Sequence, residues 1–164
     1  MKAWLGLGSN LQKPAVQLRE ALKRLAETNG IEKLEASSFY RTPPWGDEHQ
    51  DDFINAVARI ETSLEPLALL GELQSIENLM GRKRRGRRWG PRLIDIDLLL
   101  YGDSQLRLGE LEIPHPRMHE RAFVLVPLAE LDPELEIPGR GPVENYLQQI
   151  DCSGIKCMSN KDLD

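Results

Sequence analysis

The chain has 164 residues, which is enough for one domain with a hydrophobic core but too short for two full domains. Hydrophobic residues make up 40% of it, no apolar run reaches the length of a membrane span and the N-terminus lacks a signal-peptide pattern, so we expect a cytosolic protein without a membrane partner. The net charge of −5 argues against general binding to nucleic acid.

The first half of the chain alternates between strand and helix patterns. Residues 2–7 are predicted to form a strand, and residues 14–27 an amphipathic helix with apolar residues at helical spacing. Residues 31–41 read as a second strand, and a loop with two prolines over 42–50 separates it from a third strand at 53–60. Alternation along the third strand predicts one set of its side chains on each face of a sheet.

The next segment has the pattern of a helix followed by a strand. Ser63 and Pro66 are typical of a helix start, and Gly81 marks the expected end. Residues 93–101 form a strongly apolar fourth strand. The order β-α-β-β-α-β predicts an α+β fold of the ferredoxin-like type, an antiparallel sheet with both helices on one face. The buried stripe of the second helix is predicted to be Leu67, Leu70, Leu73, Ile76 and Met80.

After Tyr101 the pattern becomes weaker, and we expect C-terminal additions to the same domain, which spans residues 1–150. They include a short apolar segment at 123–131 and a short helix near 143–150. The tail 151–164 is polar and is predicted to be frayed, with Cys152 and Cys157 as reduced thiols rather than metal ligands.

Asp95-Ile96-Asp97 is the strongest local signal. Two residues apart on a strand, Asp95 and Asp97 point to the same face, while the apolar residues between and beside them point toward the helices. Two adjacent carboxylates repel each other unless a cation or nearby arginines neutralise them. Oxygen ligands without His or Cys favour Mg²⁺ over Zn²⁺, and Mg²⁺ held by few carboxylates usually also binds phosphate oxygens.

The segment directly before this strand is basic. Residues 82–92 hold seven basic residues and no acid, which leaves the rest of the chain at −12. Arginine matches phosphate oxygens in a bidentate manner, so a triphosphate is the favoured ligand. A solvated loop and an RNA contact are the alternatives, although the sheet lacks the aromatic stacking signature of RNA-binding domains. The sequence has no P-loop to hold a triphosphate.

Several motifs occur in one order over about residues 1–140. They are Leu7-Gly8-Ser9-Asn10, Ser38-Phe39-Tyr40-Arg41-Thr42-Pro43-Pro44-x-Gly46, Phe53-Ile54-Asn55-Ala56, Gln74-x-x-Glu77-x-x-x-Gly81-Arg82, Arg88-Trp89-Gly90-Pro91-Arg92-x-Ile94-Asp95-Ile96-Asp97-Leu98-Leu99, Ile113-Pro114-His115-Pro116 and Arg121-x-Phe123-Val124-Leu125-x-Pro127-Leu128. Together they resemble the 6-hydroxymethyl-7,8-dihydropterin pyrophosphokinase family of folate biosynthesis. Residues 103–112 and 151–164 match little.

The resemblance implies an enzyme that transfers pyrophosphate from ATP to the pterin hydroxymethyl group and releases AMP. It implies that Asp95 and Asp97 hold two Mg²⁺ ions and that Arg82 and Arg92 assist catalysis. The ATP site that it implies consists of Gln74, Glu77, Arg84, Trp89, Arg92, Leu98, His115 and Arg121. The pterin site that it implies consists of Thr42, Pro43, Pro44, Trp45, Phe53, Asn55, Trp89 and Phe123.

The chemistry of these residues agrees with a flat heteroaromatic substrate. Phe53 and Phe123 can stack on a pterin ring, and the Asn55 amide can bond to its donor and acceptor edges, although core packing would also explain the two phenylalanines. We expect a monomer acting on small molecules, without nucleic acid. The alternatives are another Mg-ATP-dependent kinase, an RNA-binding ferredoxin-like module and an inactive relative.

Overall fold

The structure, a computed structural model, describes residues 1–11, 13–43, 51–81 and 93–158. In these ranges no helix is long and apolar enough to cross a membrane. The core elements are β1 (Lys2–Ser9), α1 (Pro14–Ala26), β2 (Ile31–Ala36), β3 (Tyr40–Thr42), β4 (Phe53–Thr62), α2 (Pro66–Leu79) and β5 (Asp95–Tyr101).

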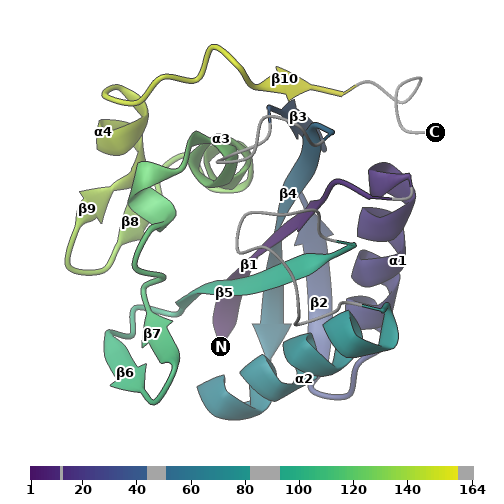
Figure 1. The fold of residues 1–164 in the computed structure, drawn as a ribbon. Helices are drawn as coiled ribbons and strands as arrows, with labels where there is room; N and C mark the ends of the chain where they lie inside the picture. The colour runs from purple at the N-terminus through teal and green to yellow at the C-terminus, as the bar shows by residue number, and fades with distance from the viewer. Residues whose placement is uncertain (12, 44–50, 82–92, 159–164) are drawn as a thin grey trace.

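These elements form the predicted α+β fold. The main sheet has the strand order β10-β3-β4-β1-β5, with β2 also paired to β4, and the pairings within it are antiparallel. Helices α1 and α2 lie side by side on one face of the sheet (Figure 1). The ferredoxin-like arrangement with both helices on one face is therefore confirmed.

The strand predicted over 31–41 is interrupted at residues 37–39. The Ser37 backbone still donates a hydrogen bond to the Val57 carbonyl at 2.8 Å, and the Val57 N–H donates to the Ser37 hydroxyl at 2.9 Å. A side-chain oxygen thus takes the place of a backbone carbonyl beside β4. Both β2 and β3 run antiparallel to β4, and they pair with successive parts of it on either side of this interruption.

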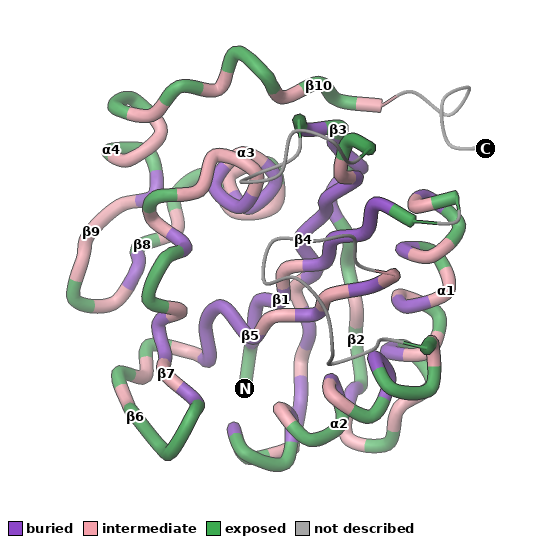
Figure 2. The backbone as a smooth tube through the Cα atoms, in the orientation of Figure 1, coloured by how far each residue is buried: buried purple, intermediate pink, exposed green. Residues whose placement is uncertain are grey.

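The buried apolar residues form two clusters, one on each face of the sheet. Figure 2 shows which parts of the backbone are buried. Ile94, Ile96 and Leu98 lie in the layer under α1 and α2, as predicted from their alternation with the aspartates.

The predicted stripe of α2 is wrong at Leu67, which is 54% exposed, while Leu69 is fully buried. The predicted cap is also wrong, because the helix begins at Pro66 and Ser63 lies outside it.

The C-terminal additions cover part of the second face. They are β6 (Leu106–Leu108), β7 (Leu111–Ile113), η1 (Met118–Glu120), α3 (Ala122–Leu131), β8 (Glu136–Ile137), β9 (Gly141–Pro142), α4 (Val143–Leu147) and β10 (Lys156–Cys157). The apolar segment expected at 123–131 is helix α3, which packs Val124, Leu125 and Leu128 against Trp4 and Val57 of the sheet. The face that carries the aspartates is therefore only partly open.

Part of the tail expected to be frayed is a strand. Lys156 and Cys157 of β10 lie opposite Arg41 and Tyr40 of β3, and the Met158 N–H donates a hydrogen bond to the Phe39 carbonyl at 2.8 Å. The unpaired backbone groups along β3 provide the partner for this polar segment. Both cysteines are free thiols in the structure, and residues 159–164 lie outside the described part.

Candidate active site

Asp95 and Asp97 face two glycines across the sheet. In the register of β1 and β5, Asp95 lies opposite Gly8 and Asp97 opposite Gly6. Directly opposed residues project to the same face, and glycine has no side chain, so β1 places no side chain of its own beside either carboxylate. Both aspartates are half-buried. A pair of partly desolvated carboxylates on one side of a strand fits a hard divalent cation, which completes its shell with water and phosphate oxygens.

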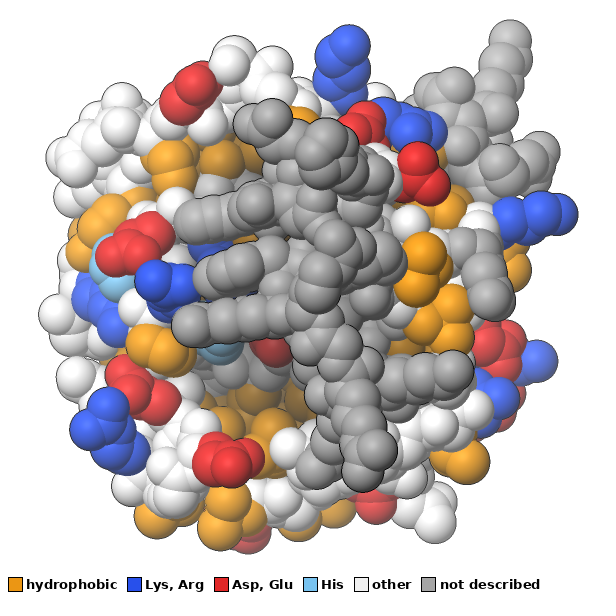
Figure 3. All heavy atoms as spheres, in the orientation of Figure 1, with side chains coloured by type: hydrophobic (Ala, Val, Ile, Leu, Met, Phe, Trp, Pro, Cys, Tyr) orange, Lys and Arg blue, Asp and Glu red, His pale blue; other side chains and the backbone are white. Residues whose placement is uncertain are grey.

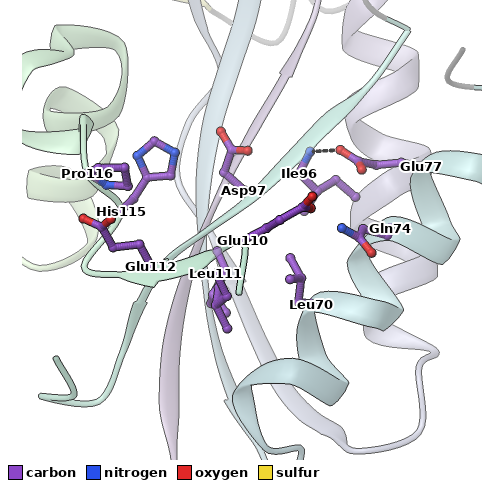
Figure 4. Close-up of a pocket in the computed structure, with 11 residues that line it drawn as sticks. Leu70, Gln74, Glu77, Ile96, Asp97, Glu110, Leu111, Glu112, His115 and Pro116 are labelled. Carbon is purple, nitrogen blue, oxygen red and sulfur yellow. Dashed lines mark hydrogen bonds between the residues drawn. The ribbon is translucent and has the colours of Figure 1, made fainter. Parts of the chain in front are cut away.

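A cavity of about 300 Å³ runs along the outer edge of β5, between α2 and the β6–β7 hairpin (Figure 4). Asp97 lies at this cavity together with four residues that the family resemblance assigns to ATP: Gln74, Glu77, Leu98 and His115. The space-filling view shows a hollow on this side of the molecule, with hydrophobic side chains inside and acidic ones near its rim (Figure 3). The structure thus brings the metal candidate and these ATP candidates to one cavity.

The rest of the cavity lining was missed by the sequence analysis. It consists of Leu70, Ile96, Glu110, Leu111, Glu112 and Pro116. Leu70 could have been found, because it lies one helical turn before Gln74 on the same face of α2. Glu110, Leu111 and Glu112 fall in a stretch that matches the family motifs poorly. The β6–β7 hairpin brings this stretch to the cavity. Its strands are too short for a periodic pattern that would predict them from the sequence.

His115 is held by backbone and side-chain contacts on two sides. Its Nδ1 accepts a hydrogen bond from the Arg117 N–H at 3.2 Å, and its carbonyl accepts one from the Arg140 guanidinium at 2.9 Å. Burial, with the positive charges of Arg121 and Arg140, lowers the pKa of His115 to about 4. With Nδ1 as acceptor, the neutral ring carries its proton on Nε2. This N–H can donate a hydrogen bond to a ligand in the cavity.

The low pKa of His115 predicts an acid-sensitive contribution to stability. The unfolded chain protonates this residue below a pKa of about 6.5, whereas the folded chain resists protonation until about pH 4. Stability from this residue is therefore complete above pH 6.5 and falls as the pH is lowered toward 4, by up to ~3 kcal/mol. Urea unfolding of a His115→Gln variant should show a weaker fall across this window; an identical fall in both proteins would contradict the prediction.

Arg121 and Phe123 lie at the start of α3, where the sequence motif placed them. The Arg121 guanidinium lies 5.5 Å from the centre of the Phe123 ring. Burial lowers the pKa of Arg121, and the carboxylates of Asp97 and Asp95 act in the opposite direction. This residue therefore interacts electrostatically with the aspartate pair, as expected for a cation near the phosphates of a nucleotide.

Of the predicted pterin residues, Thr42, Phe53 and Asn55 lie on the same face as the aspartates. Asn55 of β4 is opposite Gly8 on one side and Tyr40 on the other, and Phe53 is opposite Thr42. The Asn55 amide donates a hydrogen bond to the Thr42 hydroxyl at 2.9 Å, and both side chains are buried. A Cβ atom on Gly8 would lie only 2.7 Å from the Asn55 amide oxygen. Position 8 therefore requires glycine, because the Asn55 amide lies directly beside the β1 backbone there.

Glu130 connects α3 to the strand that carries Thr42. Its carboxylate accepts hydrogen bonds from the Ser38 N–H at 2.9 Å and the Ser38 hydroxyl at 3.2 Å, and a short one from the Tyr40 hydroxyl. Burial and this hydrogen bond raise the pKa of Tyr40. Helix α3, which carries Phe123, is thus fixed relative to β3, so both sides of the predicted pterin site are joined by one carboxylate.

Several predicted site residues lie outside the described part of the chain. They are Pro44 and Trp45 of the pterin set, Arg84 of the ATP set, Trp89 of both sets, and the two predicted catalytic residues Arg82 and Arg92, the second of which also belongs to the ATP set. Pro43 is described and is exposed next to Thr42.

Two solved structures have a similar fold. One, described as HPPK-DHPS in complex with substrates, aligns over 95% of this chain with a TM-score of 0.76 and 15% identity. The other, wild-type Plasmodium falciparum HPPK-DHPS with SDX-DHP, aligns over 90% with a TM-score of 0.67 and 19% identity. The chain spans less than half of each of these proteins, 46% and 43%. At such identities they show the fold alone.

Sequence comparison shows the family. The model of 7,8-dihydro-6-hydroxymethylpterin-pyrophosphokinase matches residues 4–133. A 2-amino-4-hydroxy-6-hydroxymethyldihydropteridine pyrophosphokinase of Methylorubrum extorquens is 50% identical over 94% of this chain and 97% of its own length. An enzyme of the same name from Haemophilus influenzae is 46% identical over 90% of this chain and 92% of its own length. The chain therefore belongs to the 7,8-dihydro-6-hydroxymethylpterin-pyrophosphokinase family, as its motifs predicted.

Proposed function

We propose that this chain transfers the β,γ-pyrophosphoryl group of ATP to the hydroxymethyl group of 6-hydroxymethyl-7,8-dihydropterin and releases AMP, in folate biosynthesis. The observation that carries the proposal is the meeting of three groups at β5 and the strands beside it. These are the aspartate pair of β5, the cavity beside Gln74 and His115, and the buried Asn55–Thr42 pair. Family membership supports the same reaction.

Asp95 and Asp97 would hold two Mg²⁺ ions. Bound there, the ions would supply charge neutralisation for the phosphates and would help to align the reacting oxygens. The chain contributes two carboxylates fixed on one strand, opposite Gly8 and Gly6 of β1. Arg121 adds a positive charge within electrostatic reach of both aspartates.

The reaction is an in-line attack. A bond forms between the substrate hydroxyl oxygen and the β-phosphorus while the hydroxyl proton passes to water, and the bond from that phosphorus to the α,β-bridging oxygen breaks, so that AMP leaves. Gln74 and Leu98 would line the nucleotide site, and the Nε2–H group of His115 would donate a hydrogen bond to a ligand oxygen. Positioning and charge account for most of the rate enhancement in such transfers. We propose Arg82 and Arg92 as further catalytic cations from the basic segment.

The pterin would lie beside Asn55 and Thr42, between the rings of Phe53 and Phe123. The Asn55 amide has further donor and acceptor capacity beyond its bond to Thr42, so it can bond to the edge of a pterin ring. We propose that Pro43, Pro44, Trp45 and Trp89 complete this site, and that the enzyme acts as a monomer on small molecules.

Product analysis tests the reaction. The protein is incubated with Mg·ATP and 6-hydroxymethyl-7,8-dihydropterin, and the nucleotides are separated by chromatography. AMP formed only when the pterin is present supports pyrophosphoryl transfer. ADP would identify a kinase that moves only the γ-phosphoryl group. Tight binding of RNA without affinity for Mg·ATP would favour the RNA-binding alternative instead.

A further inference from the structure

Glu77 is a buried acidic residue of α2 whose carboxylate contacts the backbone of β5. Its side chain is 4% exposed, and its Oε2 accepts a hydrogen bond from the Ile96 N–H at 2.8 Å (Figure 4). A buried carboxylate is unfavourable unless hydrogen bonds or charges compensate it. The Ile96 amide, the backbone group between the two aspartates, therefore stabilises Glu77, and Glu77 in turn fixes that amide.

This contact lies where the sheet offers no neighbouring strand. In the strand order of the described residues β5 is the outermost strand, paired to β1 on its inner side. Alternate residues of an antiparallel strand direct their backbone groups to opposite sides, so the Ile96 N–H that reaches Glu77 points away from β1. The Glu77 carboxylate thus serves β5 as a hydrogen-bond acceptor on the side without a strand.

We propose that Glu77 is a positioning residue for the metal site, because it holds β5 at Ile96 and so keeps Asp95 and Asp97 in the arrangement that divalent cations need. The inference rests on the proposed function, which assigns the cations to these aspartates. Asp95 and Asp97 carry like charges two residues apart on this outer strand and repel each other. The hydrogen bond that the Ile96 N–H, between the two aspartates, donates to Glu77 fixes the strand against this repulsion.

This role differs from direct contact with the nucleotide, which the family resemblance implies for Glu77. Helix α2 lies on the face opposite to the one to which Asp95 and Asp97 project. Glu77 therefore reaches the edge of β5 from the helix side and acts on the aspartates through the backbone. If it acts in this way, removing it weakens metal binding more than it weakens binding of the nucleoside part of ATP.

Four variants separate these roles. Glu77→Gln keeps a neutral acceptor oxygen of the same reach, Glu77→Leu removes the acceptor, and Glu77→Asp keeps the charge but shortens the side chain. Glu72→Leu, at an exposed position on the same helix, is the control. Binding of Mn²⁺ in the presence of a non-hydrolysable ATP analogue is followed by electron paramagnetic resonance. Binding of adenosine without metal is followed by calorimetry, and exchange of the Ile96 amide by nuclear magnetic resonance.

Glu77→Leu and Glu77→Asp should weaken Mn²⁺ binding by about 10-fold or more, the range seen when a residue that orients a metal ligand is lost. The Ile96 amide should exchange faster in both. Glu77→Gln and Glu72→Leu should stay within about twofold of the parent protein, and adenosine affinity should be unchanged throughout. The Asp variant keeps the test decisive if the Leu variant does not fold.

Two outcomes overturn the inference. One is undiminished Mn²⁺ affinity in a folded Glu77→Leu or Glu77→Asp protein. The other is a loss of adenosine affinity in Glu77→Gln, which would make the carboxylate a direct nucleotide contact. Failure of the proposed function looks different, since the parent protein itself would then bind no Mn²⁺ with the ATP analogue, or Asp97→Ala would bind it equally well.

Discussion

An Asp97→Ala variant should lose turnover by about 10³-fold or more while it keeps its fold, because loss of one metal-holding carboxylate removes several kcal/mol of charge stabilisation from the transition state. Asp97 is half-buried at the end of the cavity that Gln74 and His115 also line. Formation of AMP is measured at saturating substrates over a range of Mg²⁺ concentrations. Circular dichroism and thermal unfolding report whether the fold is intact.

The matched control is Asp103→Ala, at an exposed acidic position two residues beyond the end of β5. It should leave turnover unchanged, since it lies away from the cavity lining. Near-normal turnover in a folded Asp97→Ala protein would remove this aspartate from the metal site. Equal losses in both variants would point to a general effect of charge rather than to metal ligation.

A Gly8→Ala variant should raise the KM for the pterin about 10-fold or more and change the KM for ATP much less. The added Cβ atom would lie 2.7 Å from the Asn55 amide oxygen, so the amide must move. Asn55 is buried, and its present position also serves the hydrogen bond to Thr42. Displacing a buried amide from its partners costs about 1–3 kcal/mol, which corresponds to the expected change in KM. Steady-state kinetics with each substrate varied in turn measures both constants.

Two further variants decide whether Asn55 carries this effect. Gly71→Ala is the control, because a Cβ atom on this exposed α2 glycine meets no described atom within 4 Å beyond its neighbours and the backbone of its own helix. If the Gly8 effect acts through Asn55, the double variant Gly8→Ala/Asn55→Ala should bind the pterin no worse than Asn55→Ala alone. Additive losses would instead indicate that Gly8 acts by another route, such as its position opposite Asp95.

Alternation along the strands was enough to predict on which face of the sheet the candidate site residues lie. It placed Asp95 and Asp97 on one side of β5 and Ile96 on the other, and it placed Phe53 and Asn55 together on β4. These predictions succeeded because the period of two residues is a local property of any strand. The helix-start prediction at Ser63 failed because backbone context, rather than residue type alone, decides where a helix begins.

Features that depend on long-range contacts, or on strands of only a few residues, could not be predicted. The pairing of β10 with β3 joins residues more than 100 positions apart, and the β6–β7 hairpin has strands of only three residues. Neither has a periodic pattern long enough to recognise. The contact between Glu77 and the Ile96 N–H likewise depends on how α2 packs beside β5, so the sequence could suggest Glu77 only through a motif.

The strand β10 has a consequence for the behaviour of the protein at high concentration. An outer strand with unpaired backbone groups is a template on which another chain can add a strand and begin to aggregate. On one side of the sheet the chain's own C-terminal segment occupies part of the outer edge of β3. On the other side the Glu77 carboxylate accepts the hydrogen bond of the Ile96 N–H of β5, so this N–H is not available to another strand. The contacts that frame the substrate sites thus also discourage growth of the sheet from one molecule into the next.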